Sequence, residues 1–203
     1  MSEFPEVTDP VLDLNRRLNI GCGRDTKEGW INLDMVPGPG VDIVATLGVD
    51  TIPLPDNSID QIYASHVLEH IPNALAAMEE LWRVAKNGAM IVIKVPYGSN
   101  DVAWEDPTHV RPYFKGSFYY FSQLAYHRAH YGYWGDWDTE KIILELNADR
   151  FDVSQPLITD QVLRIVDTER NAVKEMTAIL KAVKPRRGSS PDPYNYKLML
   201  TLG

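Results

Sequence analysis

Short apolar runs alternate with a segment of helical hydrophobic period through the first half of this 203-residue chain. Five runs bounded by turn-forming residues predict buried strands: residues 18–20, 31–33, 41–47, 59–64 and 89–95. After the fourth run, Leu75, Met78 and Leu81 follow the spacing of one helix face, and Lys86-Asn87-Gly88 supplies a helix stop signal. Strands that alternate with helices predict an α/β fold with a mostly parallel sheet and helices on both faces.

The second half of the chain carries fewer strand-like runs. Residues 116–130 have the spacing of a further helix, and residues 141–147 and 196–202 are predicted as the last two strands. Between these two strands, Thr159-Asp160 is a cap for a long helix over residues 160–184 with a continuous apolar stripe. Such a helix packs on its own domain, forms a homodimer contact through residues 160–183, or covers an active site. The sequence leaves these readings open.

The domain organisation follows from length and composition. Residues 1–16 contain two prolines and are expected to form an N-terminal arm or a lid over a ligand. Residues 17–203 are long enough for one hydrophobic core and are predicted as a single domain. Residues 98–137 hold most of the aromatic side chains and are expected to form an insertion on the substrate side.

A glycine turn and an acid suggest the ligand. Gly21 and Gly23 follow the first strand directly, and Asp34 ends the second. The glycines let a ligand approach the main chain, and the carboxylate accepts hydrogen bonds from two ribose hydroxyls, which suits a nucleoside. The third glycine of a dinucleotide site is missing, and Asp34 comes earlier than the roughly 20 residues usual there. A nicotinamide oxidoreductase is therefore disfavoured.

The carboxyl ends of parallel strands meet at one edge of a sheet, where ligands bind. Gly21, Asp34, Leu47, Ser65 and His66 all fall at predicted strand ends, and so do Pro96 and Tyr97. This convergence places a ligand site at that edge.

Four sequence blocks carry a family resemblance. They are Leu18-Asn19-Ile20-Gly21-Cys22-Gly23, Gly29-Trp30-Ile31-Asn32-Leu33-Asp34, Leu54-Pro55-Asp56-Asn57-Ser58-Ile59-Asp60 and Ser65-His66-Val67-Leu68-Glu69-His70. Together they resemble compact class I S-adenosylmethionine-dependent methyltransferases of the type 11-like group, over roughly residues 17–125. The resemblance implies a Rossmann-like, seven-stranded sheet with an antiparallel final strand, and S-adenosyl-L-methionine as cofactor.

The resemblance also implies a set of cofactor contacts. Gly21, Cys22 and Gly23 would line the methionine part, and Asp34 would hold the ribose. The full set expected to touch the cofactor is Asn19, Gly21, Cys22, Gly23, Asp34, Met35, Thr46, Leu47, Ser65 and His66. Asn19 replaces an acid found in many members, and Thr46 replaces an Asp that often meets the adenine amine. These two departures favour the alternative of a catalytically silent nucleoside-binding or protein-interaction module.

Methyl transfer from a sulfonium is an in-line displacement, so the protein mainly aligns the acceptor and supplies a base. His66 at the fourth strand end is the first candidate base, and His109 in the segment 104–114 is the second. Arg111 is a candidate anchor for a carboxylate or phosphate. Compact relatives associated with sugar and polysaccharide biosynthesis carry similar Asp-Pro-Thr-His segments followed by aromatic residues.

His66, Glu69 and His70 have i, i+3, i+4 spacing, which suits a divalent metal. The block resembles the metal-binding Glu-x-x-Glu-His of ubiquinone-biosynthetic O-methyltransferases, with His66 in place of the first Glu. Leu-Glu-His also occurs widely in relatives that need no metal, so no metal ligand is assigned from the sequence.

Net charge limits the acceptor. A charge of −8 with dispersed basic residues disfavours duplex nucleic acid, whose phosphates need a basic face. No apolar run is long enough for a membrane span, and the acidic N-terminus has no signal-like core, so a cytoplasmic protein is expected. The sequence therefore predicts a methyltransferase that acts on a small polar acceptor by O- or N-methylation, with a sugar-type metabolite among the candidates.

Overall fold

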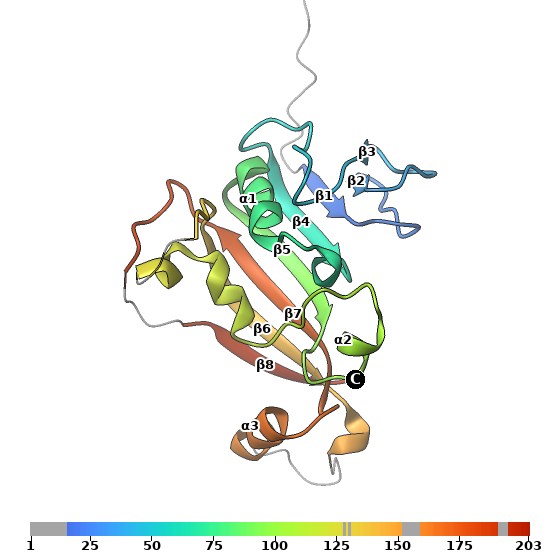
Figure 1. Ribbon diagram of the computed structural model, residues 1–203, viewed down its shortest axis with the longest axis vertical. Helices are drawn as coiled ribbons and strands as arrows, with labels where there is room; N and C mark the ends of the chain where they lie inside the picture. Colours follow the sequence, from blue (N-terminus) through green and yellow to red (C-terminus); the bar gives the residue numbers. More distant parts are fainter. Residues whose placement is uncertain (1–15, 128, 130, 152–158, 191–194) are drawn as a thin grey trace, which may run out of the picture.

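The computed structural model describes residues 16–127, 129, 131–151, 159–190 and 195–203. The predicted arm or lid at residues 1–16 therefore lies outside the described residues except for Arg16. The described chain forms one eight-stranded sheet in the order β3-β2-β1-β4-β5-β7-β6-β8 (Figure 1). The strands are β1 (Arg17–Ile20), β2 (Ile31–Asp34), β3 (Ile43–Val44), β4 (Ile59–Ser65), β5 (Ala85–Pro96), β6 (Trp137–Leu146), β7 (Val173–Ala182) and β8 (Lys197–Leu202).

Strand directions confirm the predicted fold class. The strands β3, β2, β1, β4 and β5 are mutually parallel. β7 runs antiparallel to both of its neighbours, β5 and β6. The final strand β8 runs parallel to β6. In the described chain the sheet thus has eight strands, not the predicted seven, and the expectation of an antiparallel final strand was wrong.

The predicted helix over residues 160–184 was also wrong. The helix α3 (Thr159–Thr168) ends early, and β7 follows after a turn at Asn171, whose φ is +59°. Along β7, Met176, Ala178, Leu180 and Ala182 are buried, while the residues between them are half-buried, which is the two-residue period of a strand. Pairing with β5 and β6 overrides the helical spacing of the apolar residues. The predicted homodimer contact through residues 160–183 loses its basis.

The other described helices are short. After η1 (Leu68–His70), α1 (Ala74–Val84) begins at Asn73, whose side chain accepts a hydrogen bond from the N–H of Ala76. α2 (Val102–Glu105) and η4 (Ala148–Arg150) are single turns. The helix expected over residues 116–130 is instead two 3-10 segments, η2 (Ser117–Phe121) and η3 (Gln123–His127). Extended backbone at Ser122 separates them.

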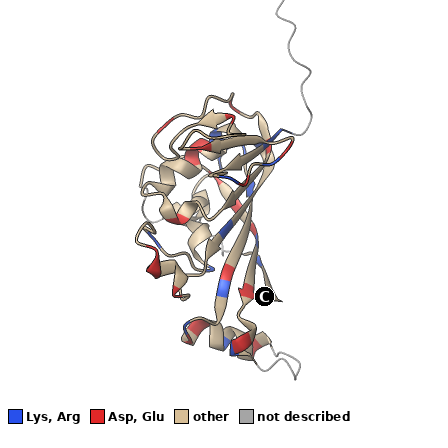
Figure 2. Ribbon diagram, turned by 90° about the vertical axis from the view of Figure 1, so that its right-hand side faces the viewer, with Lys and Arg blue, Asp and Glu red and all other residues tan. Residues whose placement is uncertain are grey.

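The described helices α1, η2 and η3 lie on one face of the sheet, and Figure 2 shows the strands along the opposite side. On the helix side, Ile62, Ile91 and Leu180 are fully buried, whereas Tyr63 and Ile179 on the other face are half-buried. The expectation of helices on both faces does not hold for the described residues. The reason is the β1–β2 connection, which spans only residues 21–30 and is too short for a crossover helix.

This short connection packs directly on the open face. Nζ of Lys27 lies 4.7 Å from the ring centre of Tyr63 on β4. The guanidinium of Arg17 lies 5.1 Å from the ring centre of Trp30. The turn after β1 is therefore held against the sheet by side chains rather than by a helix.

Candidate active site

A cavity of about 490 Å³ opens at the carboxyl ends of β1, β2, β3 and β4, the edge where the sequence predicted a ligand. Its size is ordinary for a small-molecule site. Its lining consists of Gly21, Leu33, Asp34, Met35, Ala45, Thr46, Leu47, His66, Val67, His70, Ile71, Pro72 and Thr108. We call it the first cavity. Its walls are mainly apolar, with Asp34 and two histidines as the titratable groups.

Position 21 requires glycine, both for its backbone conformation and for its contact with Val67. Its φ is +59°, in the left-handed region, and an added Cβ would lie 2.3 Å from Cγ2 of Val67. Since Val67 also lines the first cavity, the turn after β1 and the segment after β4 pack together at its floor.

Asp34 is fixed by the turn that it faces. Oδ2 accepts a hydrogen bond from the N–H of Gly23 at 2.7 Å, and Oδ1 accepts one from the N–H of Val36 at 2.9 Å. Each carboxylate oxygen accepts more than one hydrogen bond. Asp34 is therefore oriented by the backbone and still able to accept from a ligand hydroxyl.

The structure divides the residues expected to touch the cofactor into two groups. Six of them line the first cavity: Gly21, Asp34, Met35, Thr46, Leu47 and His66. Asn19, Cys22, Gly23 and Ser65 do not belong to its lining. The amide of Asn19 donates to the carbonyl of Asp25 and to Oδ1 of Asn32, so it holds the turn. Cys22 is buried, and this burial raises the pKa of its thiol.

His66 lies at the end of β4 in an unusual backbone conformation. Its φ is +53°, which is strained for a residue other than glycine, and its N–H donates to the carbonyl of Lys94 at 2.9 Å. Nδ1 lies 3.3 Å from Oε1 of Glu69, and Nε2 lies 2.8 Å from Oε2 of Glu175. Contact with Glu69, and then with Glu175, raises the pKa of the imidazole despite its partial burial. The two carboxylates thus favour the imidazolium.

A second cavity of about 500 Å³ lies on the other side of His66, which lines both. Its other lining residues are Lys94, Pro96, Asn100, Val102, Glu145, Lys174 and Glu175. Nζ of Lys94 lies 2.6 Å from Oε1 of Glu175, and this carboxylate raises the pKa of Lys94. Lys94, Glu175 and His66 therefore form a continuous chain of charged groups along the cavity wall.

Sequence reasoning missed Glu175. It lies on β7, opposite Pro96 of β5, and β7 had been predicted as part of a helix. The signal that was available is the alternation of polar and apolar residues from Met176 to Ala182, which is typical of a strand and is interrupted only at Ile179.

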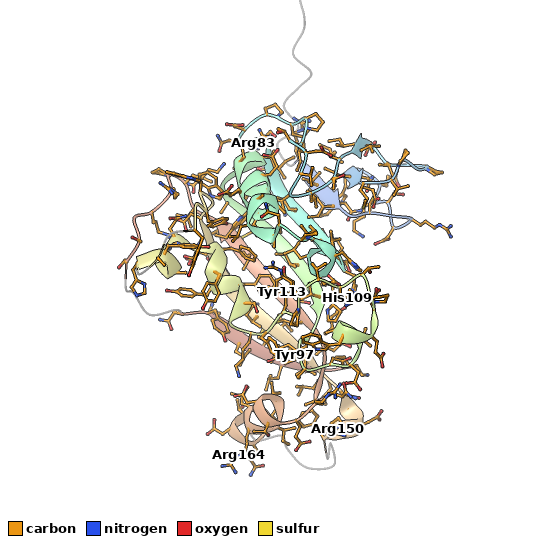
Figure 3. All side chains as sticks on the ribbon, in the orientation of Figure 1. Arg83, Tyr97, His109, Tyr113, Arg150 and Arg164 are labelled. Atoms are coloured by element: carbon orange, nitrogen blue, oxygen red, sulfur yellow. The ribbon has the colours of Figure 1, made fainter. Side chains whose placement is uncertain are left out.

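His109 and Arg111 do not join His66 in one cavity. His109 is nearly buried; its Nδ1 donates to the carbonyl of Ala103 at 3.1 Å, and its ring packs edge-to-face on His70. Figure 3 shows His109 beside α2. Arg111 donates to the carbonyl of Pro72 and lines a separate aromatic cavity with Tyr113 and Phe114.

The strand order with one reversed strand defines the class of the protein, a class I methyltransferase fold. Residues 18–93 match the family model described as a methyltransferase domain. This match runs from β1 into β5 and includes most of the first cavity's lining. The chain therefore contains a methyltransferase domain, and the resemblance found in the sequence is confirmed.

Solved structures give the same fold. A SAM-dependent methyltransferase from Archaeoglobus fulgidus aligns with a TM-score of 0.57 and 20% identity, over 82% of this chain and 86% of its own. The YcgJ protein from Bacillus subtilis aligns with a TM-score of 0.54 and 16% identity, over 86% of this chain and 93% of its own. The cyclase SpnF aligns with a TM-score of 0.52 and 14% identity, over 83% of this chain and 74% of its own. A sequence search of curated proteins gives no match.

At these identities the structural likeness establishes the fold, and the presence of a cyclase shows that the fold alone does not define a reaction. Among the described helices, none has the length and apolar character needed to cross a membrane.

Proposed function

We propose that this protein transfers a methyl group from S-adenosyl-L-methionine to a small polar acceptor, on an oxygen or a nitrogen. The observation that carries the proposal is the position of His66 between two cavities. The first cavity has the features of a nucleoside site, and the second is lined by charged groups. This is the arrangement that a two-substrate transfer needs.

The residues of the first cavity fit the cofactor that a methyltransferase domain implies. Gly21 lines the cavity at a position where a Cβ would collide with Val67, and Asp34 presents a carboxylate held by two N–H groups. Met35, Thr46 and Leu47 would contact the adenosine part. When bound, this cofactor supplies an electrophilic methyl group on a sulfonium.

The acceptor side is assigned to the second cavity. Lys94, Lys174, Glu145 and Glu175 offer both signs of charge there, which suits a small molecule with hydroxyl, amine or carboxylate groups. A negative net charge of −8 argues against a polyanionic acceptor. His109 and Arg111 lie outside this cavity and have no direct part in the proposal.

Proton removal is assigned to the His66–Glu175 pair, whose facing atoms Nε2 and Oε2 lie 2.8 Å apart on the acceptor wall. As an acceptor oxygen or nitrogen forms its bond to carbon, the proton that it loses passes to this pair when the imidazole of His66 is neutral, and Glu69 and Glu175 then stabilise the imidazolium that forms. The ammonium of Lys94, 2.6 Å from Oε1, keeps the carboxylate oriented.

Calorimetric titration tests the cofactor part. S-adenosylmethionine and S-adenosylhomocysteine should bind, and NADH should not. Asp34→Ala should weaken binding by about 1–3 kcal/mol, or about 5- to 150-fold, the range for a lost charged hydrogen bond. Asp25→Ala is the matched control, because this carboxylate is exposed and outside the cavity lining. Equal affinity for both variants would remove Asp34 from the site.

Turnover tests the acceptor part, measured as S-adenosylhomocysteine formed with a panel of small hydroxyl and amine acceptors. Glu175→Gln should lower turnover and leave cofactor affinity unchanged, because Glu175 lines only the second cavity. Glu140→Gln, which changes a half-exposed glutamate paired with Lys181, is the control. Normal cofactor binding with no turnover on any acceptor would favour the alternative of a catalytically silent nucleoside-binding module.

A further inference from the structure

Three side chains with metal-binding donor atoms gather where η1 meets the loop after α2. Glu69, His70 and His109 each offer one ligand atom, and these atoms lie within 4.8 Å of one another. We propose that these three residues bind one divalent transition metal ion of the zinc type. None of the three belongs to the His66–Glu175 pair, but the site adjoins the proposed methyl-transfer site, since Oε1 of Glu69 lies 3.3 Å from Nδ1 of His66 and His70 lines the first cavity.

Glu69 carries a buried carboxylate whose ion-pair partner among the described residues is the His66 ring. Its side chain is 3% exposed, and neither of its oxygens makes a well-aligned hydrogen bond within the described residues. Oε1 of Glu69 forms an ion pair with Nδ1 of His66 at 3.3 Å, and that ring is half-exposed and shared with Glu175. Burying a carboxylate without a close partner is costly. A bound cation would supply the missing charge.

The hydrogen bonds of both histidines leave one ring nitrogen free to coordinate. Nδ1 of His109 lies 3.1 Å from the carbonyl oxygen of Ala103, which only accepts, so Nδ1 carries the proton. Nε2 of His109 is then the nitrogen with a lone pair, and Oδ2 of Asp106 lies 3.8 Å from it, beyond hydrogen-bond distance. A ring held by a backbone carbonyl through its other nitrogen is the usual state of a metal-ligating histidine.

His70 is held in the same way through Thr108. The hydroxyl of Thr108 donates to Oδ1 of Asp106 at 2.6 Å, because a carboxylate only accepts. Oγ1 of Thr108 therefore accepts from Nδ1 of His70 at 2.9 Å, which leaves Nε2 of His70 with its lone pair. The relay from His70 through Thr108 to Asp106 orients the ring as a carboxylate does in known metal sites.

The donor set selects the kind of metal. Two imidazole nitrogens and one carboxylate oxygen suit zinc and related transition ions, whereas magnesium and calcium prefer oxygen ligands. Three protein ligands leave a further position open, and His70 and Thr108 lie on the wall of the first cavity. Ligands of a tetrahedral ion lie about 3.4 Å apart, so binding would draw the three side chains slightly closer.

The set differs from the trio expected from helical spacing, which contained His66. Because η1 begins only at Leu68 and His66 has a φ of +53°, the ring of His66 turns to Glu175. His109 takes its place from a segment 39 residues further along the chain, through a contact with His70 of 4.7 Å between ring centres.

The test uses the full chain after removal of metal with a chelator. Titration with Zn²⁺ alone should show one tight site, and Mg²⁺ should show none. His109→Ala and Glu69→Gln should each weaken Zn²⁺ binding at least tenfold. His127→Ala, which removes an exposed histidine on η3, should leave the affinity unchanged. The proposal would be overturned if His109→Ala bound Zn²⁺ as tightly as the unchanged protein. It would also be overturned if His127→Ala lost as much Zn²⁺ affinity as His109→Ala.

Cobalt substitution separates ligation from a folding effect. Co²⁺ in the native site should give visible absorption of a low-symmetry complex, and His109→Cys should add a thiolate-to-cobalt charge-transfer band. Circular dichroism checks that each variant is folded. A folded His109→Cys protein that binds Co²⁺ without this band would show that residue 109 is not a ligand, and the proposed site would be wrong.

Discussion

One added methyl group tests how tightly the first turn packs against the segment after β4. Gly21→Ala would place a Cβ 2.3 Å from Cγ2 and 2.9 Å from Cγ1 of Val67, at a φ of +59°. The left-handed backbone costs alanine about 1–2 kcal/mol. Forcing a methyl group into this contact costs about 1–3 kcal/mol more. The free energy of unfolding should therefore fall by about 2–5 kcal/mol.

Gly23→Ala is the matched control, because its φ is +48° and an added Cβ would have no atom within 4 Å. Its free energy of unfolding should fall only by the cost of the left-handed backbone, about 1–2 kcal/mol. Both variants would be compared by urea denaturation, with the slope m checked so that a shift in midpoint reports stability.

Val67→Ala completes a double-mutant cycle. It removes the two methyl carbons nearest to the new Cβ and leaves Cβ of residue 67, at 3.2 Å, so it should relieve most of the steric cost in the Gly21→Ala background. The expected interaction energy is about 1–3 kcal/mol. If Gly21→Ala is no less stable than Gly23→Ala, or if the cycle shows no coupling, the reasoning about this contact is refuted.

Three further predictions concern charge and strain. Asp136→Ala should lower the free energy of unfolding by about 3–5 kcal/mol in urea denaturation, because Asp136 is fully buried against Arg187. Asp138 also pairs with Arg187 but its side chain is half-exposed, so Asp138→Ala should change this free energy by less than about 1 kcal/mol. Burial opposes ionisation of Glu80, but hydrogen bonds from Arg83 and from a backbone N–H outweigh it and lower its pKa. Its stabilisation, measured against Glu80→Gln, should be present at neutral pH and should vanish as pH falls below its ordinary pKa of 4.5 and through the lowered value. His66→Gly should be about 1 kcal/mol more stable than His66→Ala, because only glycine relaxes at a φ of +53°, and equal urea midpoints would contradict the strain.

The parallel half of the sheet could be predicted because its signals are local. The run at 59–64 became Ile59–Ser65, and the run at 31–33 became Ile31–Asp34. The run at 41–47 shortened to Ile43–Val44. There the backbone turns after Ala45, with the N–H of Thr46 donating to Asp50. A local hydrogen bond to an Asp side chain ended a strand that hydrophobicity alone extended.

The antiparallel half could not be predicted because its signals come from distant pairing. β7 pairs with β5 at Lys94 and Thr177, positions separated by more than 80 residues along the chain. Its apolar residues satisfy a helical period as well as a strand period over this length, and only the partners decide between them. Once β7 fills the place between β5 and β6, β8 has the outer edge of β6 available and pairs there in parallel.

The candidate site also has one part that could be predicted from local signals and one part that depends on distant pairing. Gly21, Asp34 and Leu47 reach the first cavity because each ends or follows a parallel strand, so their convergence could be foreseen. Glu175 reaches the second cavity only through β7, and no spacing in the sequence links it to His66. Cofactor binding would therefore depend on the parallel strands, whereas proton removal would depend on the reversed strand. His66 belongs to both halves, since its backbone closes β4 and its ring pairs with a residue of β7. The strain at this residue is held by the contact between the two halves of the sheet.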